Sequence, residues 1–389
     1  MRILIVHNTL NDSKSLSGAL RHFLYMADEW IAAGHQTDFL AARCGFPQIS
    51  SLTPKSRLIS SDNIFDATKY LNQTWRYFPA YGHRMLTPHV TRLPDRYDIV
   101  VASTQLIVEV YPALVIARRQ NANLVAKVHH VLAAQKRRMG PFDHLFFWSE
   151  RKTTRWLSKN AKLVICGTKF VKADYKRLEQ NLGLTPAPTA ASGYGVDLAK
   201  MPDSSEFPKK YDVAVLGRLH EHKGVFHLAP IWKKVVESRP EAKLLVIGEG
   251  PHRPRVEEMF TELGIGQSVR FTGGIPEAEK DALLCESRIG LSLSFEEGWG
   301  LSINEFLAAA LPVVAYALPI FDVVFPNQLF LVEGGDIDAA ASEIVRLLSA
   351  DAERKHAGKR GRQFVMQYDF RNVAKSELKL LENIFTDGC

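Results

Sequence analysis

The sequence predicts an α/β protein with two domains, each built around a doubly wound parallel sheet that carries helices on both faces. Apolar runs of strand length alternate with helical stretches in both halves of the chain, which is typical of parallel sheets. The 389 residues are enough for two hydrophobic cores. A segment rich in proline and charge, PDSSEFPKKYD, follows Met201 and indicates a linker. We therefore expect domains over residues 1–204 and 205–370, and a last helix over 371–389.

The first half opens with a strand, a helix and a second strand. A loop that contains Gly18 follows the first strand, a helical pattern runs to Ala33, and Gly34 is the residue type that ends helices. The strands expected in this half cover residues 2–7, 36–41, 98–102, 124–128 and 163–166. Residues 47–94 are poorly periodic, and no motif in them identifies an acceptor site.

The second half repeats this alternation after the linker. The strands expected here cover residues 213–216, 243–247, 269–272, 288–293 and 313–315. In open sheets of this kind, ligands bind at the carboxyl ends of the strands. Residues that directly follow these strands are therefore the candidates for a site.

Composition is that of a soluble globular chain, with 46% apolar and 23% charged residues. The four cysteines are far apart and have no metal-ligand spacing, which predicts reduced thiols in the cytoplasm and no metal site. The apolar run near the start is too short for a signal peptide. The longest apolar run, residues 306–321, is interrupted by Pro312 and Pro319 and is too short to span a bilayer.

The net charge of +7 favours an anionic partner, which can be nucleotide phosphates, lipid head groups or nucleic acid. Residues 136–162 carry eight Lys and Arg against two acids. The aromatic residues among them are Phe142, Phe146, Phe147, Trp148 and Trp156. This pattern favours contact with an anionic membrane surface, at the inner face, although the aromatics can equally form core beneath a solvated helix face. The spacing of the aromatics is not that of an RNA-binding module, so no nucleic acid is expected.

Two carboxylates, Glu297 and Glu305, stand eight residues apart where the strand over 288–293 passes through a glycine-containing loop into a helix. Glu297 should lie at the carboxyl end of the strand and Glu305 in the first helical turn, where both can face one ligand. Two alternatives stay open. Glu305 can form a capping box with Ser302, and Glu297 can be a solvated loop charge.

A second candidate is the loop GRLHEHKG, residues 217–224, directly after the strand over 213–216. Arg218 can donate two hydrogen bonds to phosphate oxygens, Lys223 adds a point charge, and Gly224 allows close backbone approach. The loop therefore suits a diphosphate, unless the two cations are ordinary surface charges. The later run VIGEGPHR lacks the third glycine of a dinucleotide fingerprint and indicates a strand-to-helix turn. His129 and His130 end the strand over 124–128, where a histidine can bind a ligand or be structural.

The run from Glu297 to Leu301, EGWGL, followed by Glu305, resembles the E-x7-E signature of retaining glycosyltransferases of the family 4 type. The loop over 217–224 is similar to that family's G-R-x-x-x-x-K-G pattern. The resemblance implies the GT-B fold, with two Rossmann-like domains facing a central cleft and a last helix that crosses back to the first domain. The chain departs from the family in the first loop, where Ser17-Gly18 replaces a glycine pair.

The resemblance also implies a reaction, in which a retaining hexosyltransferase of glycan biosynthesis moves a sugar from a nucleotide diphosphate sugar to an acceptor hydroxyl. It implies no cofactor and no metal, and the acceptor can be a glycan, a lipid-linked molecule or a small molecule. The site residues that it implies are His129 and Glu297 for catalysis and, for the donor, Gly18, Arg218, Lys223, Gly298, Trp299, Gly300, Leu301 and Glu305. Alternatives are a sugar-nucleotide epimerase or a phosphorylase on the same fold, or a nucleotide-sugar binder without turnover.

Overall fold

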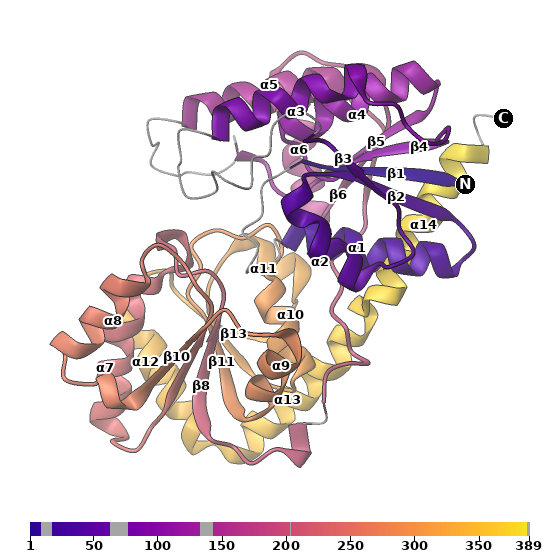
Figure 1. Cartoon of the computed structure of the whole chain (residues 1–389). Coiled ribbons are helices and arrows are strands. Elements are labelled where there is room, and N and C mark those ends of the chain that lie inside the picture. Colours follow the sequence, from indigo (N-terminus) through magenta and orange to yellow (C-terminus); the bar gives the residue numbers. More distant parts are fainter. Residues whose placement is uncertain (9–17, 63–76, 133–142, 203, 387–389) are drawn as a thin grey trace. The chain divides into compact units, whose positions relative to one another are not determined.

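A computed structural model describes residues 1–8, 18–62, 77–132, 143–202 and 204–386 (Figure 1). The chain divides into two compact units. Unit 1 holds Met1–Tyr194 together with Phe370–Cys389, and unit 2 holds Gly195–Asp369. The chain passes between units at Tyr194 and again at Asp369, whereas the expected domain boundaries were residues 204 and 370.

In unit 1, parallel strands of the described chain form a sheet in the order β3-β2-β1-β4-β5-β6-β7. The strands are β1 (Arg2–His7), β2 (Gln36–Ala41), β3 (Leu58–Ser60), β4 (Ile99–Ala102), β5 (Asn123–Val128), β6 (Ala161–Cys166) and β7 (Thr189–Ala191). Alternate residues of β1 enter different cores, because side chains along a strand point to opposite faces. Ile3 and Ile5 pack in one layer, and Leu4 and Val6 pack in the other.

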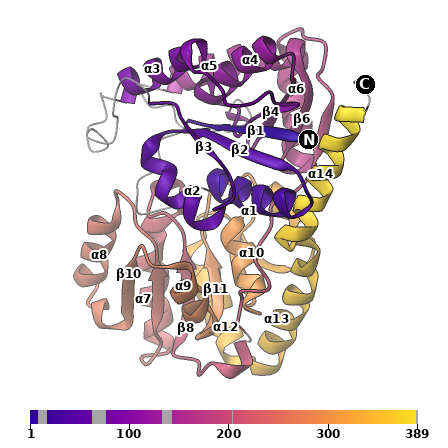
Figure 2. The ribbon, with the colours of Figure 1, turned by 45° about the vertical axis from the view of Figure 1, so that its right-hand side comes forward.

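Helices cover both faces of this sheet. The helices are α1 (Gly18–Ala32), α2 (Phe46–Leu52), α3 (Tyr77–Val90), α4 (Ile107–Gln120), α5 (Asp143–Asn160), α6 (Lys169–Asn181) and α14 (Phe370–Thr386). Neighbouring contacts link α3, α4, α5 and α6 on one face and α1, α2 and α14 on the other. Figure 2 shows α14 beside α1, where Trp30 donates a hydrogen bond to the Ala374 carbonyl at 3.1 Å.

Unit 2 repeats this plan with a parallel sheet in the order β10-β9-β8-β11-β12-β13. Its strands are β8 (Tyr211–Leu216), β9 (Leu244–Ile247), β10 (Val269–Gly273), β11 (Ser287–Ser292), β12 (Val313–Tyr316) and β13 (Leu329–Val332). Its helices are α7 (Leu228–Ser238), α8 (Arg253–Glu262), α9 (Glu277–Cys285), α10 (Leu301–Ala308), α11 (Pro319–Val324), α12 (Ile337–Ser349) and α13 (Asp351–Val365). The central neighbours β8 and β11 carry the two loops that the sequence marks as candidates.

The predicted fold class is confirmed, since both units are parallel α/β sheets with flanking helices. The expected strands all exist, with ends shifted by a few residues at most. The strands β3, β7 and β13 were not predicted. The first two have three residues each, too few for a periodic signal, and all three lie at sheet edges.

A buried polar network ties α14 to the sheet of unit 1. Lys127 of β5 and Glu377 of α14 form an ion pair in which each side chain is only 1% exposed. Ser192 donates a hydrogen bond to the same Glu377 oxygen at 2.5 Å, and His22 of α1 lies 3.1 Å from it. The carboxylate is thus satisfied by groups from three separate parts of the chain.

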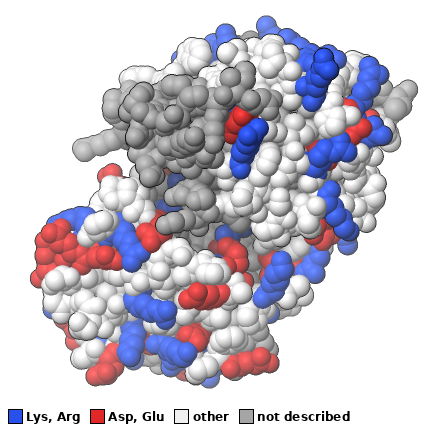
Figure 3. Space-filling model, viewed as in Figure 1, with Lys and Arg blue, Asp and Glu red and all other residues white. Residues whose placement is uncertain are grey.

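Acidic and basic side chains are interspersed over the face shown in Figure 3, so the excess positive charge does not gather in one patch there. Within the described ranges, no helix has the length and apolar character needed to cross a bilayer.

Candidate functional site

The loop after β8 and the loop after β11 pack against each other at the carboxyl ends of the two strands. Gly224 has a φ of +65°, and a Cβ there would lie 2.2 Å from the Leu293 carbonyl oxygen. The amide of Phe295 donates a hydrogen bond to the His222 carbonyl at 2.9 Å. A glycine is therefore required at position 224 for two reasons, the left-handed backbone and the close approach of Leu293.

This packing joins Lys223 to Glu297. The ammonium lies 2.5 Å from a carboxylate oxygen of Glu297, and Ser294 donates a hydrogen bond to the same oxygen at 2.8 Å. The side chains are 26% and 10% exposed, respectively. Glu297 is thus not a solvated loop charge. The ion pair brings together one residue from each predicted motif.

Arg218 lies on the same loop as Lys223, with its side chain exposed to solvent. Its loop packs against the turn after β9. A Cβ on Gly248 would lie 2.0 Å from the Gly217 carbonyl oxygen, and a Cβ on Gly250 would lie 2.3 Å from that of Leu219. The run VIGEGPHR is therefore a strand-to-helix turn, as predicted, and its two glycines serve to seat the cation loop.

The segment after Glu297 builds the entry to α10. Gly300 has φ +102° and is the N-cap residue, and Leu301 is the first helical residue and is half-buried. Trp299 is 6% exposed, and its ring meets that of Tyr368 edge-on with centroids 4.9 Å apart. Trp299 and Gly300 therefore set the shape of this turn, and Gly298 links it to Glu297.

Glu305 does not cap α10. It is the fifth residue of a helix that begins at Leu301, and no side chain caps the helix start. Both the expectation of a place in the first turn and the capping box with Ser302 are therefore wrong, because the left-handed Gly300 starts the helix before Ser302. Instead, Glu305 forms a short ion pair with Lys280 of α9, and the two side chains are 12% and 8% exposed.

His129 lies in unit 1 at the end of β5, and both of its ring nitrogens are engaged there. Nε2 lies 2.8 Å from the Ser103 carbonyl oxygen, which can only accept, so Nε2 carries the proton. Nδ1 then accepts a short hydrogen bond from the Tyr194 hydroxyl. Burial holds the pKa of His129 well below its usual 6.5, so the ring is neutral. The carbonyl of the adjacent His130 accepts a hydrogen bond from Gln105 at 2.6 Å.

The predicted residues thus fall into two groups. Lys223, Glu297 and the segment 298–301 share one set of packed loops in unit 2, and Arg218 belongs to the same loop as Lys223. Glu305 also belongs to unit 2 and lies on α10, the helix that follows this segment. Gly18, the first residue of α1, and His129 belong to unit 1. Sequence reasoning missed Ser294 and Lys280 as partners of the two glutamates. Neither stands in a motif, so pattern could not have found them.

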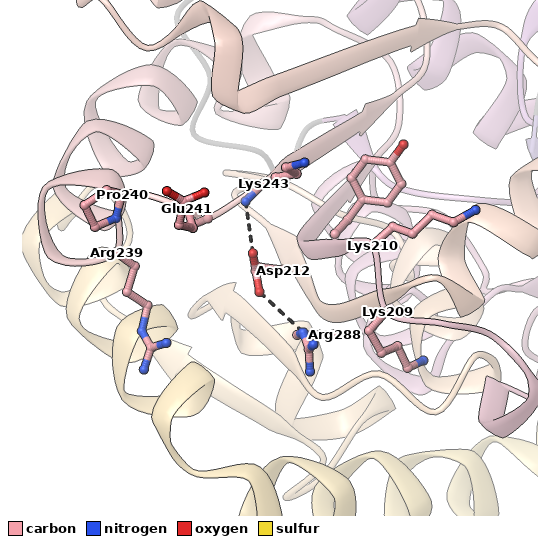
Figure 4. A pocket seen from close by; sticks show the side chains of 10 residues that line it. Lys209, Lys210, Asp212, Arg239, Pro240, Glu241, Lys243 and Arg288 are labelled. Carbon is pink, nitrogen blue, oxygen red and sulfur yellow. Dashed lines mark hydrogen bonds and ion pairs between the residues drawn. The ribbon is translucent and has the colours of Figure 1, made fainter.

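A surface hollow of about 790 Å³ lies away from these loops, at the edge where the strands of unit 2 begin (Figure 4). Asp212 lies within it, accepts a hydrogen bond from the Lys243 amide at 3.0 Å and pairs with Arg288 at 3.4 Å. Two lysines also line the hollow. Lys209 donates a hydrogen bond to the Cys285 carbonyl, and Lys210 donates one to the Glu286 carboxylate. We do not assign the donor to this hollow, because both candidate motifs lie at the opposite ends of the strands.

Among the residues that the structure describes, no three His, Cys, Asp or Glu side chains are grouped so as to hold a metal ion.

The fold is that of an α/β protein whose two candidate loops meet at the carboxyl ends of neighbouring strands. Residues 198–364 match the family described as Glycosyl transferases group 1, and residues 16–200 match Glycosyltransferase Family 4. The chain belongs to this group 1, family 4 type of glycosyltransferases.

Individual proteins are similar to this chain in sequence or in fold. Sulfoquinovosyl transferase SQD2 of Arabidopsis thaliana is 26% identical over 322 residues, a match that covers 74% of this chain and 57% of that protein. Sucrose-phosphate synthase of Thermosynechococcus elongatus shares the fold with a TM-score of 0.80 at 17% identity, covering 99% of both chains. Anabaena Alr3699/HepE, solved in complex with UDP-glucose, shares it with a TM-score of 0.75 at 16% identity, covering 98% of this chain and all of that one.

Proposed function

We propose that the protein transfers a hexose from a nucleotide diphosphate sugar to an acceptor hydroxyl, with retention of configuration at the anomeric carbon. The observation that carries the proposal is the Lys223–Glu297 pair, which unites the cation loop with the first acid of the E-x7-E run at the strand ends. The family supports sugar transfer, and the UDP-glucose complex of Alr3699/HepE supports a nucleotide sugar as donor.

Transfer of the sugar requires positive charge near the leaving diphosphate. When the bond from the anomeric carbon to the diphosphate breaks, negative charge grows on the phosphate oxygens. Arg218 offers a forked pair of donors, and Lys223 has three N–H donors and can hold Glu297 and a phosphate together. Glu297 would accept hydrogen bonds from the sugar hydroxyls, and Glu305 from the ribose.

The direct test is a panel of nucleotide sugars, scored first by thermal shift and then by the mass of the product formed with glycan, lipid-linked and small acceptors. A gain of one hexose on an acceptor is the expected product. An isomerised donor with no modified acceptor would identify an epimerase instead, and binding without turnover would leave only a nucleotide-sugar binder.

His129 stays a prediction as a catalytic residue. Any contact with a sugar would use a ring nitrogen that Tyr194 or Ser103 holds in this structure. Because the ring is neutral, it would act as a hydrogen-bond partner and not as a cation.

We further propose that donor binding needs no metal ion and no cofactor, because Arg218 and Lys223 supply the positive charge that a divalent ion supplies in other sugar transfers. Activity should be the same, within error, after dialysis against EDTA. The control adds Mg²⁺ or Mn²⁺ back to the dialysed protein. A loss on chelation that either ion restores would contradict metal independence while leaving the transfer reaction in place.

Lys223→Ala should weaken nucleoside diphosphate binding about ten- to hundredfold, because a hydrogen bond to a charged group contributes roughly 1.5 to 3 kcal/mol. The loss of Lys223 also leaves the Glu297 carboxylate facing the phosphates, which adds repulsion. Titration calorimetry with UDP and GDP measures the effect. Lys243→Ala, an exposed lysine at the other end of the same sheet, is the matched control. Equal affinity in both variants would remove Lys223 from the site.

The second partner that we propose is an anionic membrane surface, contacted by the layer of α3 and α5 in unit 1. On α5, Leu145, Phe146 and Trp148 are 45%, 49% and 54% exposed, so these side chains do not form core. On α3, Leu86 and Val90 are 67% and 68% exposed. The basic residues of α5 are Arg151, Lys152, Arg155 and Lys159. Residues 136–142 of the predicted segment lie outside the described residues.

Flotation with vesicles of phosphatidylserine and phosphatidylcholine tests this surface. Binding at low salt should fall at high salt, because each basic residue near an anionic surface contributes about 1 kcal/mol that salt screens. Phe146→Ser with Trp148→Ser should abolish it, whereas Val323→Ser, which removes an exposed apolar side chain of unit 2, should not. Failure to float with anionic vesicles at low salt would exclude this surface.

A further inference from the structure

Lys280 of α9 is a buried cation that the proposed reaction does not use. Its side chain is 8% exposed, and its ammonium contacts three carboxylates. Glu277 lies at 2.8 Å and Asp281 at 3.2 Å, and the contact with Glu305 is a short ion pair. Burial raises the pKa of Asp281, which Lys280 partly offsets. Lysine is rarely buried unless paired, and these three carboxylates supply the pairing here.

Of these carboxylates, only Glu305 belongs to the E-x7-E run. Glu277 is a neighbour on α9 and is 46% exposed, and Asp281 is adjacent to Lys280 in the chain. Glu305 comes from α10, the helix that starts at the Trp299–Gly300 turn. The contact therefore reaches from α9 across to the helix that carries the second acid.

The ion pair restricts the direction of the Glu305 side chain. A glutamate has three rotatable side-chain bonds, and the contact with Lys280 through Oε1 holds the carboxylate in one orientation. A carboxylate has about four lone-pair positions, so this contact is compatible with a further hydrogen bond from a ligand hydroxyl. A charged acceptor that is held in place binds a hydroxyl more tightly than one that must first be ordered.

We propose that Lys280 is a positioning residue that orients Glu305 to accept a hydrogen bond from the ribose, and that it thereby sets the preference for ribonucleoside over deoxyribonucleoside diphosphates. The inference rests on the proposed function and deepens it. Lys280 acts through Glu305 and does not contact the reacting atoms. A purely structural lysine would join α9 to α10 without affecting this preference.

The test measures the affinities of UDP and GDP, and of the 2′-deoxy and 3′-deoxy analogues of each, by titration calorimetry. Glu305 should accept from either the 2′- or the 3′-hydroxyl of the ribose. For UDP or for GDP, the unaltered protein should therefore bind the ribonucleotide about ten- to hundredfold more tightly than the deoxy analogue that lacks that hydroxyl. Lys280→Met should reduce this affinity ratio to about one to three. The affinity for the deoxy analogue should change little. Lys280→Arg should keep most of the ratio, and Glu305→Gln should lose it as Lys280→Met does.

Melting temperatures separate this role from a structural one. A Lys280→Met protein that melts lower but keeps the full ratio would overturn the inference and leave an anchor between two helices. Lys280→Gln, which keeps a hydrogen-bond donor, replaces the Met variant if that does not fold, and is expected to lose at least part of the ratio. Ribonucleotide binding with no preference in the unaltered protein also overturns the inference, whereas absence of any UDP or GDP binding overturns the proposed function itself.

Discussion

Replacing Glu297 with Gln is expected to lower turnover of the nucleotide sugar about 10²- to 10³-fold, the usual cost of removing one polar group that stabilises a transition state. The amide is close in shape to the carboxylate and can still accept from Ser294, which contacts Glu297 at 2.8 Å. The loop should therefore keep its fold. What is lost is a charged acceptor for sugar hydroxyls beside the developing positive charge of the anomeric centre.

The affinity of Glu297→Gln for the free nucleoside diphosphate should be unchanged or tighter. In the unaltered protein, the Lys223 ammonium lies 2.5 Å from the Glu297 carboxylate, which offsets its charge. The neutral amide leaves that positive charge for the phosphates. Loss of turnover together with retained diphosphate affinity would place the effect in the transition state and not in donor binding.

Glu296→Gln is the matched control, since it makes the same change one residue earlier in the loop. Initial rates over a range of donor concentrations and calorimetry with the diphosphate complete the measurement. Full turnover by Glu297→Gln would contradict a catalytic role for Glu297. A loss of diphosphate affinity equal to the loss of turnover would show that Glu297 only holds Lys223 in place.

Replacing Lys127 with Met should lower the free energy of unfolding by about 3 to 5 kcal/mol, because it leaves a buried charge without its partner. Glu377 is 1% exposed, and burial alone would raise its pKa. Lys127 and His22 outweigh that effect and hold the pKa of Glu377 below its ordinary 4.5. The carboxylate is thus charged at neutral pH, and its contribution to stability is lost only as the pH falls below about 4.5.

The double variant Lys127→Met with Glu377→Leu should recover most of this loss, since apolar groups of similar volume often replace a buried ion pair at little cost. Urea unfolding followed by tryptophan fluorescence measures both variants, and Trp30, which is hydrogen-bonded to α14, contributes to that signal. If the double variant is no more stable than Lys127→Met alone, the penalty would come from packing and not from an unpaired charge. Unfolding of the single variant within 1 kcal/mol of the unaltered protein would also contradict this account.

Much of the fold could be predicted because its strands are short apolar runs separated by helical periods. The strand β4 is apolar and buried along its whole length, and β1, β5 and β8 carry that signal over most of theirs. The three-residue strands β3 and β7 carry almost none. The start of α10 was misplaced because a left-handed Gly300 can begin a helix without a capping side chain, and the Ser302–Glu305 spacing imitates a capping box.

The sequence by itself determined the two-unit α/β plan and the placement of two loops at strand ends, with Lys223 in one and Glu297 in the other. These features are local, since each depends on residues within one strand, loop and helix. Only the tertiary structure decided which charges meet. Lys223 and Glu297 are 74 residues apart and pair because β8 and β11 are neighbours in the sheet. Lys280 of α9 contacts Glu305 of α10, and Lys127 contacts Glu377, 250 residues further along the chain. The packing of the elements determines these contacts, and they cannot be read from hydrophobic periodicity.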